Sequence, residues 1–125
     1  MNNKKIGSDF ERETCETLNR MGFWVHFITP DSATGKQPFD VIAVKDGKAY
    51  AIDCKTCEDR YFRIGRTEDN QLLAFGKWAR CGNANAFFLV KHKGEALIVS
   101  HETLLADGRA DLESGEYEVM FTCAL

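Results

Sequence analysis

The spacing of apolar and polar residues predicts two main helices. In residues 8–21 the apolar side chains recur at helical intervals, and Gly22 is placed to end the helix. This range opens with a Ser-x-x-Glu sequence, which is typical of the capping box at the start of a helix. A second helical stretch begins at Thr67, which we expect to cap it, and ends at Gly82.

Shorter apolar runs, rich in β-branched and aromatic residues, predict strands. The pair Asp46-Gly47 lies between two of these runs and predicts a tight hairpin turn. The run 84–91 is almost continuously apolar, as expected of a strand buried on both faces. The expected strands are residues 23–28, which should enter the core, and residues 39–44, 49–52, 84–91 and 95–100.

The remaining stretches are shorter or irregular. Residues 29–37 are rich in turn formers and predict a loop, and residues 56–66 predict an irregular basic segment. Ser100 is placed to cap a short helix over residues 101–106, and residues 117–122 are a possible last strand.

The order of helix, three strands, helix and two strands predicts an α/β fold, an α+β mixed sheet with helices packed on it. A chain of 125 residues can bury one core. We therefore expect a single domain over residues 1–125, with its core at about 7–100 and an acidic C-terminal extension at about 101–125. No run approaches the roughly 18–20 apolar residues of a membrane helix, so no membrane association is expected.

Charge is distributed unevenly along the chain. The net charge of −3, taken as a whole, argues against binding to nucleic acid. Residues 1–100 contain 15 Lys and Arg against 13 Asp and Glu, a balance of +2, whereas residues 101–125 contain one against six, a balance of −5. The acidity is therefore concentrated in the last fifth of the chain, and a positive potential elsewhere remains compatible with the composition.

The five cysteines have no disulfide-framework spacing, and the first residues contain no apolar secretory segment. We therefore expect reduced thiols and a cytoplasmic location. Cys54 and Cys57 form a Cys-x-x-Cys motif, for which zinc and redox interpretations are alternatives. Zinc needs a second pair of ligands at similar spacing, and a redox motif usually opens a helix, whereas a loop is expected here. A core position for Cys54 is the favoured interpretation.

Three charged residues lie at one end of the predicted hairpin. If the chain turns at Asp46-Gly47, Asp40 and Asp53 oppose each other, and Lys55 shares a face with Asp53. Two adjacent carboxylates repel each other unless a cation lies between them, and carboxylates with water are the usual ligands of Mg²⁺. A lysine beside that cation can orient water or stabilise charge on a phosphate. Ordinary solvated strand-end charges are the alternative interpretation.

Basic residues near the hairpin are candidates for contact with DNA. Residues 56–66 interleave arginines with Tyr61 and Phe62, a combination that suits phosphates and unstacked bases. A solvated surface loop is the alternative. The candidate side chains are Lys36, Arg60, Arg63 and Arg66.

Two short motifs carry a resemblance to known nucleases. Pro38-Phe39-Asp40 followed by Asp53-Cys54-Lys55 resembles the PD-(D/E)xK nuclease signature, with Asp in place of the commoner Glu at the second acid. The sequence Gly7-Ser-Asp-Phe-Glu11-Arg12-Glu13 resembles the start of the first helix in archaeal and phage Holliday-junction resolvases. The resemblance covers about residues 7–100 and implies a restriction-endonuclease-like core.

The resemblance implies a metal site and catalytic roles. Asp40 and Asp53 would bind Mg²⁺, for which Mn²⁺ would substitute. Glu11 and the main-chain carbonyl of Cys54 would complete the metal site. Lys55 would position or activate the attacking water. Helix physics alone favours N-terminal capping as the role of Glu11, and the two roles are compatible.

The resemblance also implies contacts with the substrate. Arg12 would approach a DNA phosphate. Gln71, in the first turn of the second helix, would contact substrate or water, and an exposed position on the helix is the alternative.

These features predict a Mg²⁺-dependent endodeoxyribonuclease, a hydrolase that is best explained as a Holliday-junction resolvase. A four-way junction has two strands to cut symmetrically, so we expect branched DNA as partner and a homodimer with two-fold symmetry. Strand 84–91 and Trp78 are candidate sources of its interface. The alternatives are another repair, restriction or phage DNA-processing nuclease of this fold, or a catalytically silent DNA-binding protein.

Overall fold

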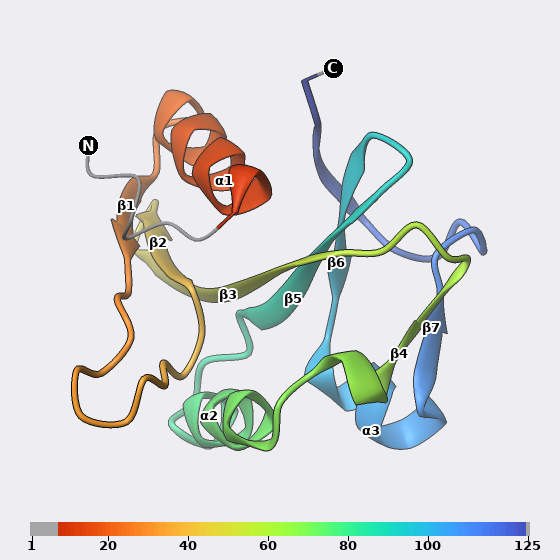
Figure 1. Cartoon of the computed structure of the whole chain (residues 1–125). Coiled ribbons are helices and arrows are strands. Elements are labelled where there is room, and N and C mark those ends of the chain that lie inside the picture. The colour runs from red at the N-terminus through yellow and green to blue at the C-terminus, as the bar shows by residue number, and fades with distance from the viewer. Residues whose placement is uncertain (1–7, 125) are drawn as a thin grey trace.

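The computed structural model describes residues 8–124, which contain three α-helices, a 3₁₀ turn and eight strands (Figure 1). The α-helices are α1 (Asp9–Arg20), α2 (Asp69–Arg80) and α3 (His101–Asp107), and the 3₁₀ turn is η1 (Ile64–Arg66). The strands are β1 (Trp24–Phe27), β2 (Val41–Lys45), β3 (Lys48–Thr56), β4 (Tyr61–Arg63), β5 (Ala86–His92), β6 (Glu95–Val99), β7 (Arg109–Asp111) and β8 (Val119–Thr122).

Six of the strands form one mixed sheet in the order β1-β2-β3-β5-β6-β8. Strands β3 and β5 pair in parallel, while the other neighbours in this sheet are antiparallel. Because a parallel pair needs a crossover, α2 lies in the connection from β3 to β5. The expected mixed sheet is confirmed.

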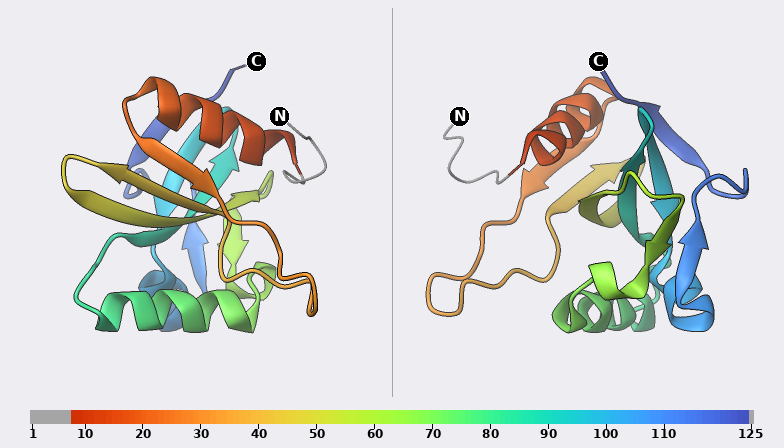
Figure 2. Two further views of the ribbon diagram at one scale, coloured as in Figure 1. Left: turned by 90° about the vertical axis from the view of Figure 1, so that its left-hand side faces the viewer. Right: turned by 45° about the vertical axis from the view of Figure 1, so that its right-hand side comes forward.

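Helices cover both faces of the sheet (Figures 1 and 2). On one face α1 packs Phe10 and Leu18 into a cluster that includes Ile52 of β3. On the other face Phe75 of α2 and Leu104 of α3 belong to a second cluster. Since β3 and β5 contribute buried side chains to both clusters, these two strands are the centre of the molecule, and β5 has the burial expected from its continuous apolar sequence.

The β2–β3 hairpin turns at Asp46 and Gly47, as expected. Their φ values are 53° and 77°, and positive φ at both central residues is the requirement of a type I′ turn. Strand β3 continues four residues beyond Ile52, the last residue that pairs with β2. This unequal length leaves the end of β3 bordered by β5 on one side only.

Of the two N-caps expected for the main helices, one is confirmed and one is wrong. Ser8 caps α1, with its Oγ accepting a hydrogen bond from the Glu11 N–H at 3.1 Å. The N-cap of α2 is Glu68, not Thr67, and Glu68 shares a reciprocal capping box with Gln71. The Thr67 hydroxyl instead donates to the Ile64 carbonyl at 2.7 Å, so it closes η1 rather than opening α2.

Two other expectations need correction. Strand β1 lies at the edge of the sheet with Trp24 exposed, rather than entering the core. Residues 56–66 are not irregular, because β4 and η1 form there. The last strand expected at residues 117–122 is confirmed as β8, which pairs with β6, and β7 pairs with β4 in a second, two-stranded sheet. The last segment therefore contributes strands to both sheets.

Replacement of Phe75 by Ala should test the core under α2. The Phe75 ring is fully buried, with its centroid 5.0 Å from that of Phe88 and 5.7 Å from that of Phe39. We expect Phe75→Ala to lower the free energy of unfolding by about 3–5 kcal/mol in urea titration, because it removes a large ring and leaves a cavity. Leu73→Ala on the same helix, where the leucine is 71% exposed, is the control and should change it by less than about 1 kcal/mol.

Candidate active site

The register of the β2–β3 hairpin brings Asp40 opposite Asp53. Val41 pairs with Ile52, and the Asp40 N–H donates to the Ile52 carbonyl at 3.1 Å. Ile42 pairs with Ala51, and Asp40 and Asp53 each lie two residues further toward the same end of the hairpin. Residues in direct register point to the same face of a sheet, so the two carboxyl groups share a face. The expected juxtaposition is confirmed.

Lys55 lies beside Asp53, as the two-residue period of a strand requires. Its Nζ is 3.3 Å from Asp53 Oδ2. Cys54, between them, points to the opposite face and belongs to the cluster under α1. At the end of β3, the carboxyl group of Asp53 and the ammonium group of Lys55 therefore project from one face of the sheet, and Cys54 projects from the other.

The two carboxylates are buried but differ in their hydrogen bonds. Asp40 is 8% exposed and Asp53 is 1% exposed. Asp40 accepts from the Cys54 N–H at 2.8 Å and from Gln37 Nε2 at 2.7 Å. Among the residues that the structure describes, neither oxygen of Asp53 has a hydrogen-bond partner, although the Lys55 ammonium lies within ion-pair distance. Buried carboxylate oxygens without donors are available to a cation.

Burial favours the protonated forms of both acids, and repulsion by the neighbouring acid adds to this effect at Asp40. Burial, reinforced by the charge of Asp53, raises the pKa of Asp40 to about 8, against the lowering effect of the Cys54 N–H. Burial also raises the pKa of Asp53, although Lys55 acts in the opposite direction. At neutral pH a proton is therefore retained within this pair, and a divalent cation supplies the positive charge that would take its place.

The acid pair lies in a polar cleft of about 230 Å³. Its walls come from the first turn of α1, the loop before β2, the end of β3 and the start of α2. The lining residues are Glu11, Gly35, Lys36, Gln37, Asp40, Asp53, Cys54, Lys55, Glu68 and Gln71.

The expected residues Glu11 and Gln71 lie in this cleft for different structural reasons. Glu11 is in the first turn of α1, where its N–H is bound by the Ser8 cap. Gln71 is buried, and its Oε1 accepts from the Glu68 N–H at 3.1 Å. Each cap fixes the first turn of a helix at the rim of the cleft. The interpretation of Gln71 as an exposed helix residue is wrong.

The fit to a metal depends on the two aspartates. Across residues 8–124, no three side chains of His, Cys, Asp or Glu are already arranged as a complete metal-binding group. Asp40 and Asp53 nevertheless provide adjacent buried oxygens, which suit Mg²⁺ because this ion is usually held by one or two carboxylates and retains several waters. The donor set therefore fits a hard cation, while ligation by Glu11 and the Cys54 carbonyl remains a prediction.

The expected DNA-contacting arginines lie outside the lining of this cleft. Arg12 forms an ion pair with Asp9 at 3.0 Å and lines a separate cleft beside α1. Arg66 Nη2 donates to the Thr56 carbonyl at 2.7 Å. The guanidinium of Arg63 lies 5.6 Å from the centroid of the Tyr61 ring. The structure therefore brings Lys36, but none of these three arginines, to the rim of the acid pair.

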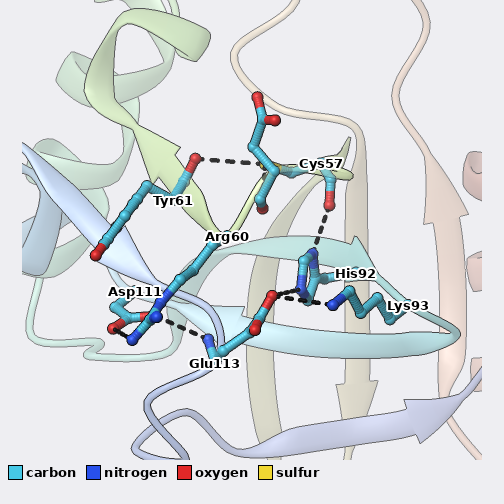
Figure 3. Close-up of polar contacts among 8 residues, drawn as sticks. Cys57, Arg60, Tyr61, His92, Lys93, Asp111 and Glu113 are labelled. Carbon is cyan, nitrogen blue, oxygen red and sulfur yellow. Dashed lines mark hydrogen bonds and ion pairs between the residues drawn. The ribbon is translucent and has the colours of Figure 1, made fainter.

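Arg60 belongs to a network that connects the end of β3 to the acidic last segment (Figure 3). Its Nε and Nη2 each donate to Asp111 at 2.9 Å. Nearby, His92 Nδ1 donates to the Cys57 carbonyl at 2.8 Å, and His92 Nε2 lies 3.1 Å from Glu113. A bidentate pair of this kind engages the Nε–Nη2 edge of the guanidinium, so Arg60 has a structural partner in this state.

The Cys-x-x-Cys motif does not form a site. Cys54 lies in the cluster under α1, and Cys57 lies in the cluster under α2 and α3, on the other face. Both thiols are buried and free. The interpretation of Cys54 as a core residue is confirmed.

Gln37 and Glu68 line the cleft but were not expected from the sequence. Gln37 binds Asp40, and its own carbonyl accepts from Asn70 Nδ2 at 2.9 Å, a contact between residues 33 positions apart. No local pattern identifies such a pair. Glu68 had a local signal, since it stands three residues before Gln71 in a capping box.

The mixed sheet, with paired acids and a lysine at the end of one strand, defines a nuclease of the restriction-endonuclease-like PD-(D/E)xK class. A model of the archaeal Holliday junction resolvase (Hjc) family matches residues 2–119. The chain belongs to this family, and its function is that of a Holliday junction resolving nuclease. No described helix has the length and apolar content needed to cross a membrane.

A solved structure supports the same fold. The chain is similar to Hjc of Archaeoglobus fulgidus, a Holliday junction resolvase from an archaeal hyperthermophile, with a TM-score of 0.63 and 17% identity. The match covers 83% of this chain and 85% of the other. A search of curated proteins found no match.

Replacement of Asp53 by Asn should reveal the repulsion within the acid pair. A carboxyl whose pKa is raised by folding destabilises the protein increasingly as pH rises from its unfolded value of 3.8 toward about 8. In metal-free buffer at pH 8, we expect Asp53→Asn to increase the free energy of unfolding by more than about 1 kcal/mol, with the gain shrinking toward pH 4. Thermal unfolding followed by circular dichroism measures this.

Asp46→Asn is the matched control, because it makes the same chemical change in the exposed hairpin turn and keeps a favourable Asn-Gly sequence. It should show no such pH dependence. An Asp53→Asn protein that is equally or less stable than the parent at pH 8 would contradict the assigned repulsion.

Proposed function

We propose that this chain cleaves branched DNA as a Mg²⁺-dependent endonuclease, with Asp40, Asp53 and Lys55 as its catalytic residues. The observation that carries the proposal is the convergence of two buried carboxylates and an ammonium group in one polar cleft. Mn²⁺ would substitute for Mg²⁺, because both are hard cations that accept oxygen ligands.

The metal would be held by Asp40 and Asp53, with the Cys54 carbonyl and Glu11 as further ligands. When bound, Mg²⁺ polarises a phosphodiester and lowers the pKa of a water ligand. The burial of the Asp53 oxygens without hydrogen-bond donors supports this assignment, because a cation offsets the cost of burying their charge. Gln37 and the Cys54 N–H would hold Asp40 in the orientation needed.

The remaining groups act on water and phosphate. The Lys55 ammonium, paired with Asp53, would orient the attacking water or stabilise negative charge on the phosphate. The Oε1 of Gln71 is engaged by its capping bond, so its Nε2 would be the group that donates to a phosphate or water oxygen. Lys36, on the loop that lines the cleft, would contact an adjacent phosphate.

The other basic residues would contribute at a distance from the cleaved bond. Arg12, Arg60, Arg63 and Arg66 remain candidates for phosphate contacts. Arg63 is the strongest of these candidates, because its contact with the Tyr61 ring is weak and leaves its N–H groups able to donate to a phosphate. Arg60 would first have to release Asp111. We place the reaction in the cytoplasm, where reduced thiols such as Cys54 and Cys57 persist.

Loss of the Lys55 charge should remove activity without unfolding the protein. We expect Lys55→Met to reduce the Mg²⁺-dependent cleavage rate of a four-way junction at least about 100-fold, since acid–base and electrostatic roles have effects of this size. The measurement is single-turnover cleavage, with folding checked by circular dichroism. Lys48→Met, an exposed position at the start of the same strand, is the control and should keep the parent rate.

Asp53→Asn should be inactive and should bind no Mn²⁺ by calorimetry, whereas the parent binds it. A panel of linear duplex, flap, single-stranded and four-way DNA separates junction resolution from another nuclease activity. Normal cutting by Asp53→Asn would refute the proposed metal site.

Two symmetric cuts require two active sites, so we propose a two-fold homodimer. The interface expected at residues 84–91 is not available, because β5 lies in the middle of the sheet and its Phe88 is fully buried. Trp78 is also occupied, since its ring packs edge-on against Phe39. A different surface would therefore form the contact.

Light scattering at micromolar concentration should give about twice the chain mass of 14.1 kDa. A monomer that still makes paired cuts in a junction would contradict the dimer.

A further inference from the structure

An aromatic pair lies exposed on the edge strand β1. The rings of Trp24 and His26 are stacked, with their planes 11° apart and their centroids separated by 6.0 Å. Trp24 is 61% exposed, and His26 is also exposed. Large flat rings on a strand usually gain stability from burial, and this stack instead leaves ring surface accessible to a ligand.

The register connects this pair to the acid cleft. Trp24 pairs with Val44 and His26 pairs with Ile42, so these residues share a face of the sheet. The next position on that face is Ile28, whose N–H donates to the Asp40 carbonyl at 2.7 Å. The aromatic pair and the catalytic carboxylates therefore lie on one continuous face.

The distance along this face is short. Ile28 is four positions after Trp24, which corresponds to about 13 Å of extended chain. Ile28 and Ile42 pack against the core under α2, whereas Trp24 and His26 continue beyond that packing at the open edge of the sheet. Figure 2 shows β1 along this edge, with the loop that leads to the cleft leaving from its end.

The chemistry of the stack suits a nucleobase. Every base presents a flat π face, and indole is a good stacking partner for any base sequence. A DNA strand whose phosphate lies at Asp40 and Asp53 would carry neighbouring bases over this face. At a branch point, bases can leave the helical stack, which exposes the faces that an aromatic side chain binds.

We propose that Trp24 and His26 form a platform on which an unpaired or unstacked base next to the branch point stacks. This inference rests on the proposed nuclease function and adds a substrate contact to it. The platform would favour branched DNA over linear duplex, because duplex bases are already stacked on each other. Its ring faces would contribute affinity without reading sequence.

The test uses the full chain with Asp53→Asn, which prevents cleavage, and a synthetic four-way junction. The chain contains two tryptophans, so Trp78→Phe leaves Trp24 as the sole indole fluorophore. We expect the junction to quench this fluorescence and a linear duplex of the same sequence to have little effect. In the cleavage-blocked protein, Trp24→Leu should weaken junction affinity about tenfold, and Trp24→Phe should retain most of it.

Cleavage and mass measurements separate the outcomes. In the protein with Asp53 intact, Trp24→Leu should still cut the junction at saturating enzyme concentration, which shows that fold and metal site are preserved. Unchanged junction affinity in Trp24→Leu would overturn the platform but leave the nuclease assignment standing. Failure of the parent to bind the junction would overturn both. Conversion of a dimer to a monomer by Trp24→Leu would identify the face as a subunit contact and overturn the platform.

Discussion

Two buried carboxylates that repel each other are held together by the register of one hairpin. Burial raises the pKa of both Asp40 and Asp53, and the charge of Asp53 raises that of Asp40 further, so bringing two charged carboxylates together here has a cost. Their positions follow from the ladder below them, which ends at the pair Val41 and Ile52. The two hydrophobic clusters on either side of the sheet fix that ladder, and their burial offsets the cost of the acid pair. The fold thus holds together two acids whose mutual repulsion is relieved either by a retained proton or by a cation.

Unequal strand lengths turn this arrangement into a cleft. If β2 were as long as β3, another strand would bond to the backbone edge beside Asp53 and Lys55, and its side chains would share their face. Instead, β3 continues beyond β2 and is supported by β5, where Asp53 pairs with Phe88 and Lys55 pairs with Val90. One edge of this part of β3 is therefore bonded to β5, and on the other edge the Cys54 N–H donates to the Asp40 carboxylate instead of to a strand. This combination provides fixed geometry and access at the same point, which catalytic groups require.

Local sequence signals were sufficient for the hairpin and its acids, because the Asp46-Gly47 turn fixes the register by itself. The caps of α1 and α3 were equally local. The parts that sequence reasoning missed depend on contacts between distant residues. Strands β4 and β7 are three residues each and exist only through mutual pairing, so neither has a periodic pattern of its own. Gln37 reaches Asp40 from an irregular loop, and only the fold reveals that contact.

Charge counting also fails for a structural reason. Residues 1–100 are slightly basic and residues 101–125 are acidic, which suggests that the acidic residues lie apart from the basic ones. In the structure the acidic end is next to the basic segment after β3, and Asp111 binds the Nε–Nη2 edge of the Arg60 guanidinium. That pair is exposed, so it contributes little to stability, but it offsets the charge of an arginine that the composition counts as basic. Lys36 and Lys55 are the basic residues that line the cleft itself. Because the charges of the acidic end and of Arg60 meet in the fold, the net charge of the chain does not describe the charge around the acid pair.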